Sequence, residues 1–450
     1  MQKNKDLNRR ILKLAIPNVI SNITVPFVGI VDIALVGRMG SSAYIGGVGF
    51  GAMVFTLIYT GLVFLRMGTT GLTAQAYGAS EFKEASNSLL RALIFALFAA
   101  VLLLLLQVPI KNLLILNLAG SADALGFAAE YFNYRIWAAP ATLSVFVFMG
   151  WFIGMQNSKI PMIITIIISL TNIILSSFFV VILGMKIEGV ALGTVIAQYT
   201  GLIFCFYFFN KKYKRIASLF DIKSILILEK LKRFFSVSRD IFIRSLLLTG
   251  SFFLFNVLSA SFGEDILALN SMMLQFLWFF AWVTDGFAYA GGTLAGRYIG
   301  AKDKISLRES VSKSVLFGFF LALGFTLIYL FAGQGIMHIL TDNSAVINLA
   351  KDYHIWIWIM PLLSFLAFLY DGIYVGATAT AKMRNIMIVS VILIYLPALF
   401  ALKHYFGNQG MWMAIILLLA ARGIGLKLFL KQSVYGRVLE VPLWTSEINK

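Results

Sequence analysis

Apolar blocks follow one another along this chain, each about 17 to 25 residues long, which is the length of a helix that crosses a bilayer. Hydrophobic residues make up 60% and charged residues 13% of the 450, whereas soluble domains carry about 25% charged residues. No connection between blocks is long enough for a sizeable soluble domain. The sequence therefore predicts an all-α polytopic membrane protein in contact with a lipid bilayer.

Twelve such blocks are bounded by charged residues or by clusters of Gly, Pro and Asn. The first six lie near residues 11–37, 47–72, 89–107, 132–154, 160–182 and 188–209. The second six lie near residues 238–260, 269–293, 312–332, 354–376, 386–402 and 410–430. We expect two six-helix lobes, residues 1–209 and 238–450, joined by a basic linker over residues 210–237.

The 37 Lys and Arg residues are distributed unevenly along the chain. With the N-terminus inside, the outer connections hold only Arg38, Lys111, Lys186, Lys351 and Lys403. Lys and Arg in short loops favour the cytoplasmic side, so we expect both termini to be cytoplasmic and the first apolar block to be an uncleaved helix. This pattern accounts for the net charge of +17, and no nucleic-acid partner is expected.

The two halves of the chain align when the sequence is shifted along itself so that Gly150 falls on Gly372. The same shift places the small-residue segment 68–79 on the small-residue segment 290–301. To within one position, it also matches two further glycines, a tryptophan and a proline: Gly154 with Gly376, Gly189 with Gly410, Trp137 with Trp358 and Pro140 with Pro361. The shift carries each block onto the one six further on, so the lobes share one orientation, as in parallel-repeat secondary transporters. Two lobes in one chain make a monomer sufficient.

Three aspartates, Asp32, Asp285 and Asp371, fall inside apolar blocks. A charge at the bilayer centre costs about 2.5 to 3.5 kcal/mol or more and is a functional hypothesis by default. Asp32 follows Pro17 and Pro26; each proline removes a backbone donor and bends its helix. We expect the bent helix to move during transport and Asp32 to bind H+ or Na+, with helix pairing as the alternative role.

Asp285 and Asp371 lie among aromatic residues of the second lobe, including Tyr374. A carboxylate beside aromatic faces can hold an organic cation, so these residues are candidates for a cation or substrate site; a structural role is an equal alternative. Arg66 is a possible counter-ion. Arg244 and Arg422 are further possible partners for the buried aspartates.

Several kinds of protein are disfavoured by what the sequence lacks. The single cysteine, Cys205, excludes an internal disulfide. No nucleotide-binding P-loop, metalloprotease helix or nucleophile elbow occurs, so we expect neither an enzyme nor a bound cofactor. Uphill transport would then draw on a gradient of H+ or Na+. A membrane-embedded enzyme or an assembly scaffold would need clustered catalytic residues or a large extramembrane domain.

With these residues in view, the chain resembles the multidrug and toxic compound extrusion (MATE) family, and within it the bacterial DinF-like branch. The resemblance covers roughly residues 7–430. It is carried by five segments, in order: Ile16-Pro17-Asn18, residues 31–37, 64–79 and 188–194, and residues 371–378 followed by Met383-Arg384-Asn385. Their order and spacing together are specific.

The resemblance implies a twelve-helix, two-lobed antiporter in the bacterial inner (plasma) membrane that exports amphipathic or cationic small molecules in exchange for H+ or Na+. A coupling carboxylate in the first helix falls on Asp32, with polar partners on Asn172 and Thr194. Some relatives carry a second acid where this chain has Ser176, and this departure favours H+ over Na+. An acid in the tenth helix matches Asp371.

The alternative within transport is a lipid-linked saccharide flippase of the same superfamily. Such chains often add two helices, and a cavity for a pyrophosphate headgroup needs several central Arg or Lys residues. In this sequence only Arg66 is a fair candidate.

Overall fold

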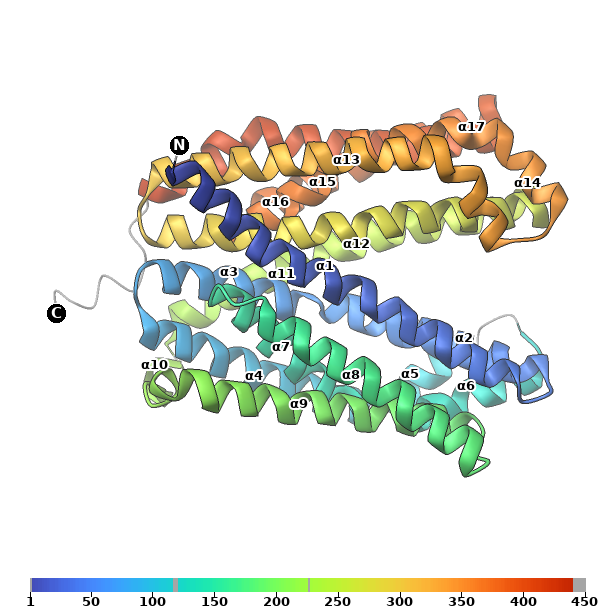
Figure 1. The fold of residues 1–450 in the computed structure, drawn as a ribbon, viewed down its shortest axis with the longest axis horizontal. Coiled ribbons are helices and arrows are strands. Elements are labelled where there is room, and N and C mark those ends of the chain that lie inside the picture. The colour runs from blue at the N-terminus through green and yellow to red at the C-terminus, as the bar shows by residue number, and fades with distance from the viewer. Residues whose placement is uncertain (1, 116–119, 226, 440–450) are drawn as a thin grey trace. The chain divides into compact units, whose positions relative to one another are not determined.

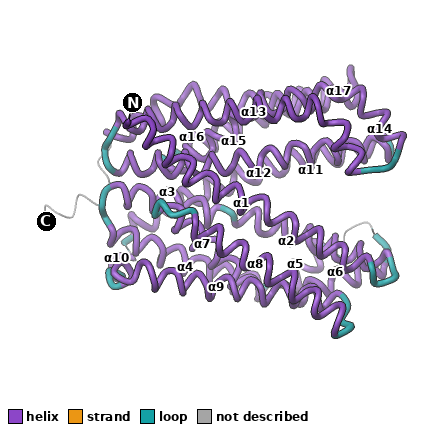
Figure 2. The backbone as a smooth tube through the Cα atoms, viewed as in Figure 1, coloured by secondary structure: helices purple, strands orange, loops and turns teal. Residues whose placement is uncertain are grey.

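The computed structural model describes residues 2–115, 120–225 and 227–439, and these ranges contain helices and no strand (Figures 1 and 2). The helices of the first half are α1 Gln2–Gly37, α2 Ser42–Leu62, α3 Phe64–Gly78, α4 Phe82–Leu105, α5 Gln107–Leu114, α6 Ala122–Arg135, α7 Ala139–Gly154, α8 Lys159–Ser177, α9 Ile187–Ala217 and α10 Ile222–Ile225. Those of the second half are α11 Leu228–Ser259, α12 Glu264–Gly300, α13 Lys304–Leu340, α14 Ser344–Ala350, α15 His354–Gly376, α16 Thr380–Val389 and α17 Leu396–Leu430. The all-α fold class is confirmed.

Short 3-10 and π segments continue several of these helices. The 3-10 segments are η1 Ile136–Ala138, η3 Ala260–Phe262, η4 Lys351–Tyr353 and η7 Gly436–Leu439, and the π segments are η2 Phe178–Ile182, η5 Ser390–Tyr395 and η6 Lys431–Tyr435. Many helices extend beyond the apolar blocks; α12, for example, covers Glu264–Gly300 where the sequence predicts 269–293. Apolar blocks mark the part of a helix in the hydrocarbon, whereas the helix continues into the polar boundary.

Among the described residues, eleven helical runs are long and apolar enough to cross a membrane. The last run, Thr380–Val438, has 59 residues, which at 1.5 Å each would extend about 88 Å, far beyond a core of about 30 Å. Gly407 breaks its helical conformation with φ 55° and ψ −134°. A Cβ on Gly410 would overlap the carbonyl oxygen of Leu402, so the chain folds back here. The run therefore holds the last two of the twelve predicted crossings.

By their contacts, the described residues form two compact units. Unit 1 comprises Met1–Val19, Gly78–Ser80 and Phe235–Lys450, and unit 2 comprises Ile20–Tyr77 and Glu81–Phe234. The predicted lobes, residues 1–209 and 238–450, differ from these units in two main places. The segment Met1–Val19 belongs with the second half of the chain, and most of the predicted linker belongs with the first half.

The assignment of Met1–Val19 to unit 1 follows from a close helix contact. A Cβ on Gly286 of α12 would overlap the side chain of Val19 and lie 3.1 Å from the carbonyl oxygen of Ala15. Only a residue without a side chain permits this approach. The first part of α1 is therefore packed on α12, and α1 continues unbroken through Pro17 and Pro26 to Gly37.

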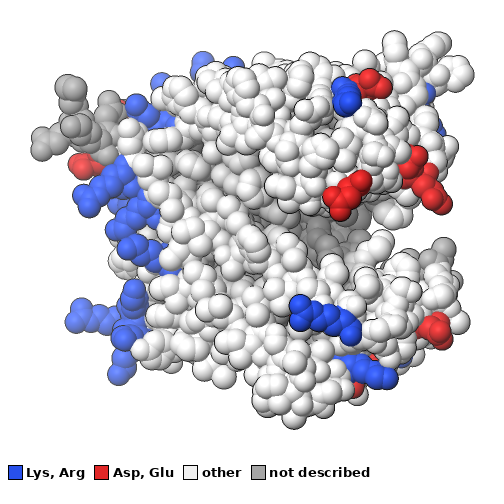
Figure 3. Space-filling model, turned by 45° about the vertical axis from the view of Figure 1, so that its right-hand side comes forward, with Lys and Arg blue, Asp and Glu red and all other residues white. Residues whose placement is uncertain are grey.

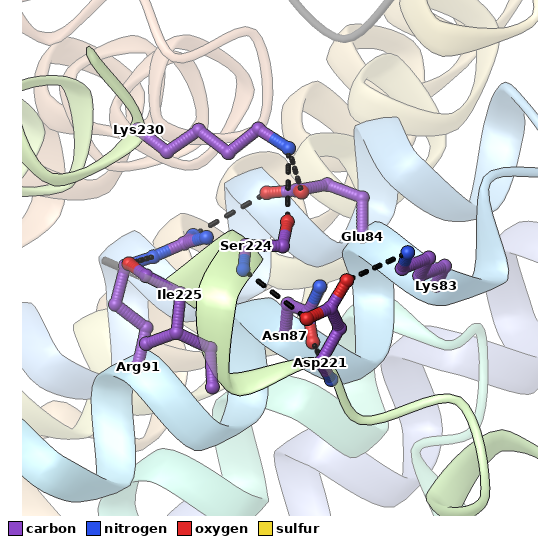
Figure 4. Close-up of polar contacts among 8 residues, drawn as sticks. All are labelled: Lys83, Glu84, Asn87, Arg91, Asp221, Ser224, Ile225 and Lys230. Atoms are coloured by element: carbon purple, nitrogen blue, oxygen red, sulfur yellow. Dashed lines mark hydrogen bonds and ion pairs between the residues drawn. The ribbon is translucent and has the colours of Figure 1, made fainter. Parts of the chain in front are cut away.

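The linker belongs to unit 2 because a polar network ties it to α4 (Figure 4). Glu84 of α4 lies between two basic side chains, with Oε1 3.3 Å from Nη1 of Arg91 and Oε2 3.1 Å from Nζ of Lys230. Arg91 Nε also donates to the carbonyl of Ile225 at 3.4 Å. Asp221 forms a second ion pair with Lys83 at 2.8 Å. The basic linker is thus a docked segment and not a loose tether.

The internal repeat is visible in the backbone. Ser80 and Lys302 have positive φ of 61° and 55°, and Gln156 and Thr378 have φ of 61° and 51°; the shift that places Gly150 on Gly372 matches both pairs. In each turn the next N–H donates to a carbonyl five residues back, at 2.9 Å in all four cases: Glu81 to Ala76, Asp303 to Tyr298, Asn157 to Phe152 and Ala379 to Tyr374. This is the Schellman pattern that ends a helix, and it is used at equivalent places in both halves.

The glycines matched by the repeat also pack in equivalent ways. A Cβ on Gly150 of α7 would overlap the carbonyl oxygen of Arg66 in α3, and one on Gly372 of α15 would overlap that of Ala288 in α12. Arg66 and Ala288 are themselves matched by the repeat. The repeat therefore preserves a backbone-to-backbone helix contact within each unit, in the way that small residues allow in membranes.

Basic side chains gather at one end of each unit on the face shown in Figure 3. In unit 1 this end carries the start of α1 and the turn between α12 and α13. In unit 2 it carries the start of α4 and the end of α9 (Figure 1). These are the segments that the sequence predicts to be cytoplasmic.

Candidate functional site

Asp32 is the buried carboxylate of unit 2. It lies in α1, within the apolar run Asp6–Gly37, and is 8% exposed. Its Oδ1 atom is buried and has no hydrogen-bond partner among the described residues. The cation that interacts with it electrostatically is Arg135, yet the described part of unit 2 brings no guanidinium or ammonium nitrogen within 4.0 Å of Asp32. Asp32 is thus a carboxylate without a fixed ion-pair partner.

Arg135 ends α6, inside the membrane-crossing run Ala122–Gly154. Its guanidinium carbon lies 5.3 Å from the ring centre of Phe55 and 5.7 Å from that of Tyr131, and it interacts electrostatically with Tyr59 and Asp32. The side chain is half-buried, and its Nε atom is buried without a hydrogen-bond partner in the described ranges. The Arg135 guanidinium therefore lies against aromatic rings, and no carboxylate of the described residues contacts it directly.

Asn172, Ser176 and Thr194 come together between α8 and α9, and their role as partners of Asp32, which the resemblance implies, stays a prediction. Asn172 Nδ2 donates to Thr194 Oγ1 at 2.8 Å, and the hydroxyls of Thr194 and Ser176 donate to the carbonyl of Val190 at 3.0 and 3.5 Å. Gly193 makes this approach possible, because a Cβ there would overlap Ser176 Oγ. The group is largely satisfied internally; Asn172 Oδ1 is buried and has no hydrogen-bond partner in the described chain.

The two candidate acids of unit 1, Asp371 and Asp285, are in a different environment. Asp371 of α15 uses Oδ2 to contact both Arg244 of α11 and Arg422 of α17. Asp285 of α12 is half-buried and interacts electrostatically with both arginines. The pairing of Arg244 and Arg422 with a buried aspartate, expected from the sequence, is confirmed for Asp371. Two carboxylates and two guanidiniums balance one another, so this cluster is already neutral.

Tyr374 and Arg66, two other candidates from the sequence, lie in helix contacts. Tyr374 is fully buried, and its hydroxyl donates to the carbonyl of Leu426 at 2.7 Å, which joins α15 to α17. Arg66 is half-buried at the start of α3, and its carbonyl accepts a hydrogen bond from Thr70 at 2.9 Å. The counter-ion role of Arg66 stays a prediction, since the cation acting on Asp32 is Arg135.

Sequence reasoning missed Arg135 together with Tyr59 and Tyr131. Arg135 falls near the end of a predicted block, where a basic side chain is ordinarily explained by snorkelling to the interface. A usable signal was present: Tyr131 and Arg135 are four residues apart, so they share one face of a helix.

Two equivalent helical halves, each with ionisable side chains inside its crossings, match the repeat architecture found among membrane transporters. The MatE family model matches residues 17–178 and again 241–400, once in each half. The chain belongs to the MatE family of membrane transporters.

Individual relatives agree with this assignment. The chain is 37% identical over 418 residues to the DNA damage-inducible protein F of Escherichia coli K12, covering 92% of this chain and 90% of that protein. It is 26% identical to the probable multidrug resistance protein NorM of Thermotoga maritima, with 91% and 89% covered. The fold is similar to that of the Vibrio cholerae MATE transporter VcmN in its bent form, with a TM-score of 0.85, 18% identity and 98% and 99% of the chains covered.

Proposed function

We propose that this transporter is a cation-coupled exporter of amphipathic small molecules that carry a positive group, and that Asp32 is the residue that takes up the coupling ion. The observation that carries the proposal is the state of the Asp32 carboxylate: buried in α1, with an oxygen that lacks a hydrogen-bond partner among the described residues. A carboxylate in such a place gains from binding either a proton or a cation.

Asp371, the other carboxylate suggested by the resemblance, is less suited to this task. Both guanidiniums contact its Oδ2 atom, so protonating this carboxylate would leave two buried cations without the charge that balances them, although its Oδ1 atom has no hydrogen-bond partner among the described residues. A buried charge left without its partner costs several kcal/mol. We assign Asp371, with Asp285, to holding unit 1 together.

The polar residues that the resemblance pairs with Asp32 favour H+ over Na+. Na+ needs several oxygen ligands, as hard cations do, whereas a proton needs one carboxylate. Where some relatives carry a second acid, this chain has the neutral Ser176, so a metal ion would lack one negatively charged oxygen ligand. The coupling ion we propose is therefore H+.

The transport cycle follows from competition at one carboxylate. Ionised Asp32 holds the positive group of the substrate, and protonation from outside removes that charge and releases the substrate. The protonated carrier then returns inward, with the proline-bearing helix α1 as the moving element, and discharges the proton. Because linkage is reciprocal, substrate from inside promotes loss of the proton, which is the sign that antiport requires.

The alternative function, a lipid-linked saccharide flippase, is supported less well. A pyrophosphate group needs several cations, and Arg244 and Arg422 of unit 1 are already bound to Asp371. Inside the crossings of unit 2, the candidate cations are Arg66 and Arg135.

The test is uptake of a fluorescent amphipathic cation into proteoliposomes, with a pH gradient and a Na+ gradient imposed separately. We expect the pH gradient to drive uptake by the native protein and Asp32→Asn to abolish it. Asp123→Asn, which changes an exposed aspartate at the start of α6, is the matched control and should transport normally. Unchanged pH-driven uptake by Asp32→Asn would contradict the assignment, and uptake driven by Na+ alone would contradict H+ coupling.

A further inference from the structure

The interior charges of the two units are arranged differently. In unit 1 both interior arginines contact Asp371 directly. In unit 2 Asp32 and Arg135 interact electrostatically, but no ion pair within 4.0 Å joins them among the described residues. Buried polar atoms without a hydrogen-bond partner in the described ranges occur in both clusters, on Asp32 and Arg135 and also on Asp371, Arg244 and Arg422; what differs is the direct contact of opposite charges. Asp32 and Arg135 are thus two oppositely charged groups of unit 2 that act on each other without forming an ion pair.

We propose that Arg135 is the specificity-determining residue of the Asp32 site and that the transported compound is a zwitterion, with an anionic group bound to Arg135 and a cationic group facing Asp32. This inference rests on the proposed function and names the charge type of its substrate. A guanidinium is suited to the anionic half because its planar fork matches a carboxylate in a bidentate way.

Charge counting distinguishes the zwitterion from other substrates. With Asp32 ionised, the pair Asp32 and Arg135 is neutral. A zwitterion leaves the total at zero and gives each buried group a partner, whereas a simple cation makes the total +1 and leaves Arg135 uncompensated. Buried charges are tolerated when they are paired, so the zwitterion is favoured over the simple cation.

An anion is disfavoured by the direction of coupling. A purely anionic substrate on Arg135 would bind better when Asp32 is protonated, so proton and substrate would enter the site together, which is symport. A zwitterion needs the ionised carboxylate for its cationic half, and protonation of Asp32 weakens its binding. Antiport depends on competition between the proton and the substrate for Asp32, and only a substrate with a positive group competes in this way.

The groups around Arg135 suit the body of such a molecule. The rings of Phe55 of α2 and Tyr131 of α6 lie near the guanidinium, with centres 5.3 and 5.7 Å from its carbon, and Tyr59 of α2 interacts with it electrostatically. Phe55 stacks on Phe132 with ring centres 5.2 Å apart. The charged and titratable groups that act on Arg135 are Asp32, Tyr59 and Tyr131, so within the described residues Asp32 is the carboxylate that competes for it. Aromatic surfaces beside a paired charge fit a flat, amphipathic zwitterion.

The test compares two dyes that differ in one group. Rhodamine B carries a carboxylate and a cationic ring system, and its ethyl ester is a simple cation of the same shape. Binding of each dye to purified protein in detergent is measured by fluorescence anisotropy for the native protein, Arg135→Gln and Arg135→Lys. Arg38→Gln, which changes an exposed arginine of the same unit, is the control.

We expect the native protein and Arg38→Gln to bind rhodamine B about tenfold to a hundredfold more tightly than the ester, as a charge-assisted hydrogen bond implies. Arg135→Gln should abolish this ratio, and Arg135→Lys should retain part of it. A merely structural role for Arg135 would weaken both dyes equally and leave the ratio unchanged. Equal affinity of the native protein for the two dyes, affinity for neither, or a ratio that survives Arg135→Gln would overturn the inference.

Transport is measured separately in proteoliposomes, so that this inference and the proposed function can fail independently. Selective binding of rhodamine B without uptake driven by a pH gradient would contradict the exporter proposal and support the role of Arg135. Equal, pH-driven uptake and binding of both dyes would support the exporter and overturn the zwitterion.

Discussion

Gly376 of α15 lies against Gly292 of α12 so closely that a Cβ on Gly376 would overlap the Gly292 carbonyl oxygen. In the first half, a Cβ on Gly154 would lie 2.9 Å from the carbonyl oxygen of Thr70, and the internal repeat matches Gly154 with Gly376 and Thr70 with Gly292. The same contact thus recurs in each unit, where helix backbones can approach only if no side chain intervenes.

This contact predicts the effect of adding one methyl group. Gly376→Ala should destabilise unit 1 by about 1–3 kcal/mol, the usual cost of overpacking a closely packed core. Gly324→Ala in α13 is the control, because its Cβ meets nothing within 4 Å, and removal of a helix glycine should leave stability equal or slightly higher. Thermal unfolding in detergent measures both. Equal melting temperatures for the two variants would contradict the prediction.

Neutralising Asp371 should damage the fold before it affects coupling. Asp371→Asn leaves Arg244 and Arg422 together without the carboxylate that both contact, and removing one partner of a buried ion pair costs about 3–5 kcal/mol. We expect a lower melting temperature and a lower yield of folded protein, with Asp123→Asn unaffected. A stable Asp371→Asn protein that binds substrate but no longer responds to a pH gradient would instead make Asp371 the coupling residue.

The ion pairs that Glu84 makes should hold the linker more strongly than the ion pair between Lys83 and Asp221. Glu84→Gln breaks the ion pairs to Arg91 and Lys230, and the Arg91 side chain is only 4% exposed. Losing these pairs should cost roughly 1.5 kcal/mol, so we expect protease cleavage of the linker to increase by about tenfold or more. Lys83→Gln breaks a pair whose lysine is 58% exposed, and exposed pairs contribute about 0–1 kcal/mol. Limited proteolysis followed by mass spectrometry compares the two. Similar cleavage of both variants would show that the network does not hold the linker.

The turn between α12 and α13 offers a stabilising change. Lys302 is exposed and has φ 55°, a left-handed conformation that costs a residue with a side chain roughly 1–2 kcal/mol relative to glycine. Lys302→Gly should therefore raise stability by up to about 1 kcal/mol, after the larger entropy of the unfolded glycine chain is counted. A lower melting temperature of the Lys302→Gly variant would mean that the lysine side chain stabilises the folded protein by more than the left-handed backbone conformation destabilises it.

Much of the architecture could be predicted because it depends on patterns within the sequence itself. Apolar length identifies the crossings, and the internal shift that matches Gly154 with Gly376 also matches the turns at Ser80 and Lys302. Asn172 donates to Thr194, and the pairing of both with Asp32 that the resemblance implies stays a prediction.

What the sequence could not supply is the choice among possible partners. From the sequence, Arg66, Arg244 and Arg422 are all possible partners of a buried aspartate, with Arg66 singled out as a counter-ion, and only packing places Arg244 and Arg422 on Asp371. The position of Arg135 along the sequence does not reveal that α2 and α6 bring aromatic rings around it. Likewise, the docking of the linker on α4 depends on Glu84, whose charge alone does not identify its neighbours.

The contact between Gly286 and the Ala15–Val19 stretch also affects how the chain is made. Translation adds about 5–20 residues per second, so Gly286 follows Val19 by roughly 13–50 s. Throughout that time the first turns of α1 are inserted while their packing surface does not yet exist, and the helix must meanwhile be accommodated by lipid or by the insertion machinery. Assembly of unit 1 is therefore completed only after the whole of unit 2 has been synthesised, so a truncated product would retain unit 2 and leave the start of α1 without its partner helix.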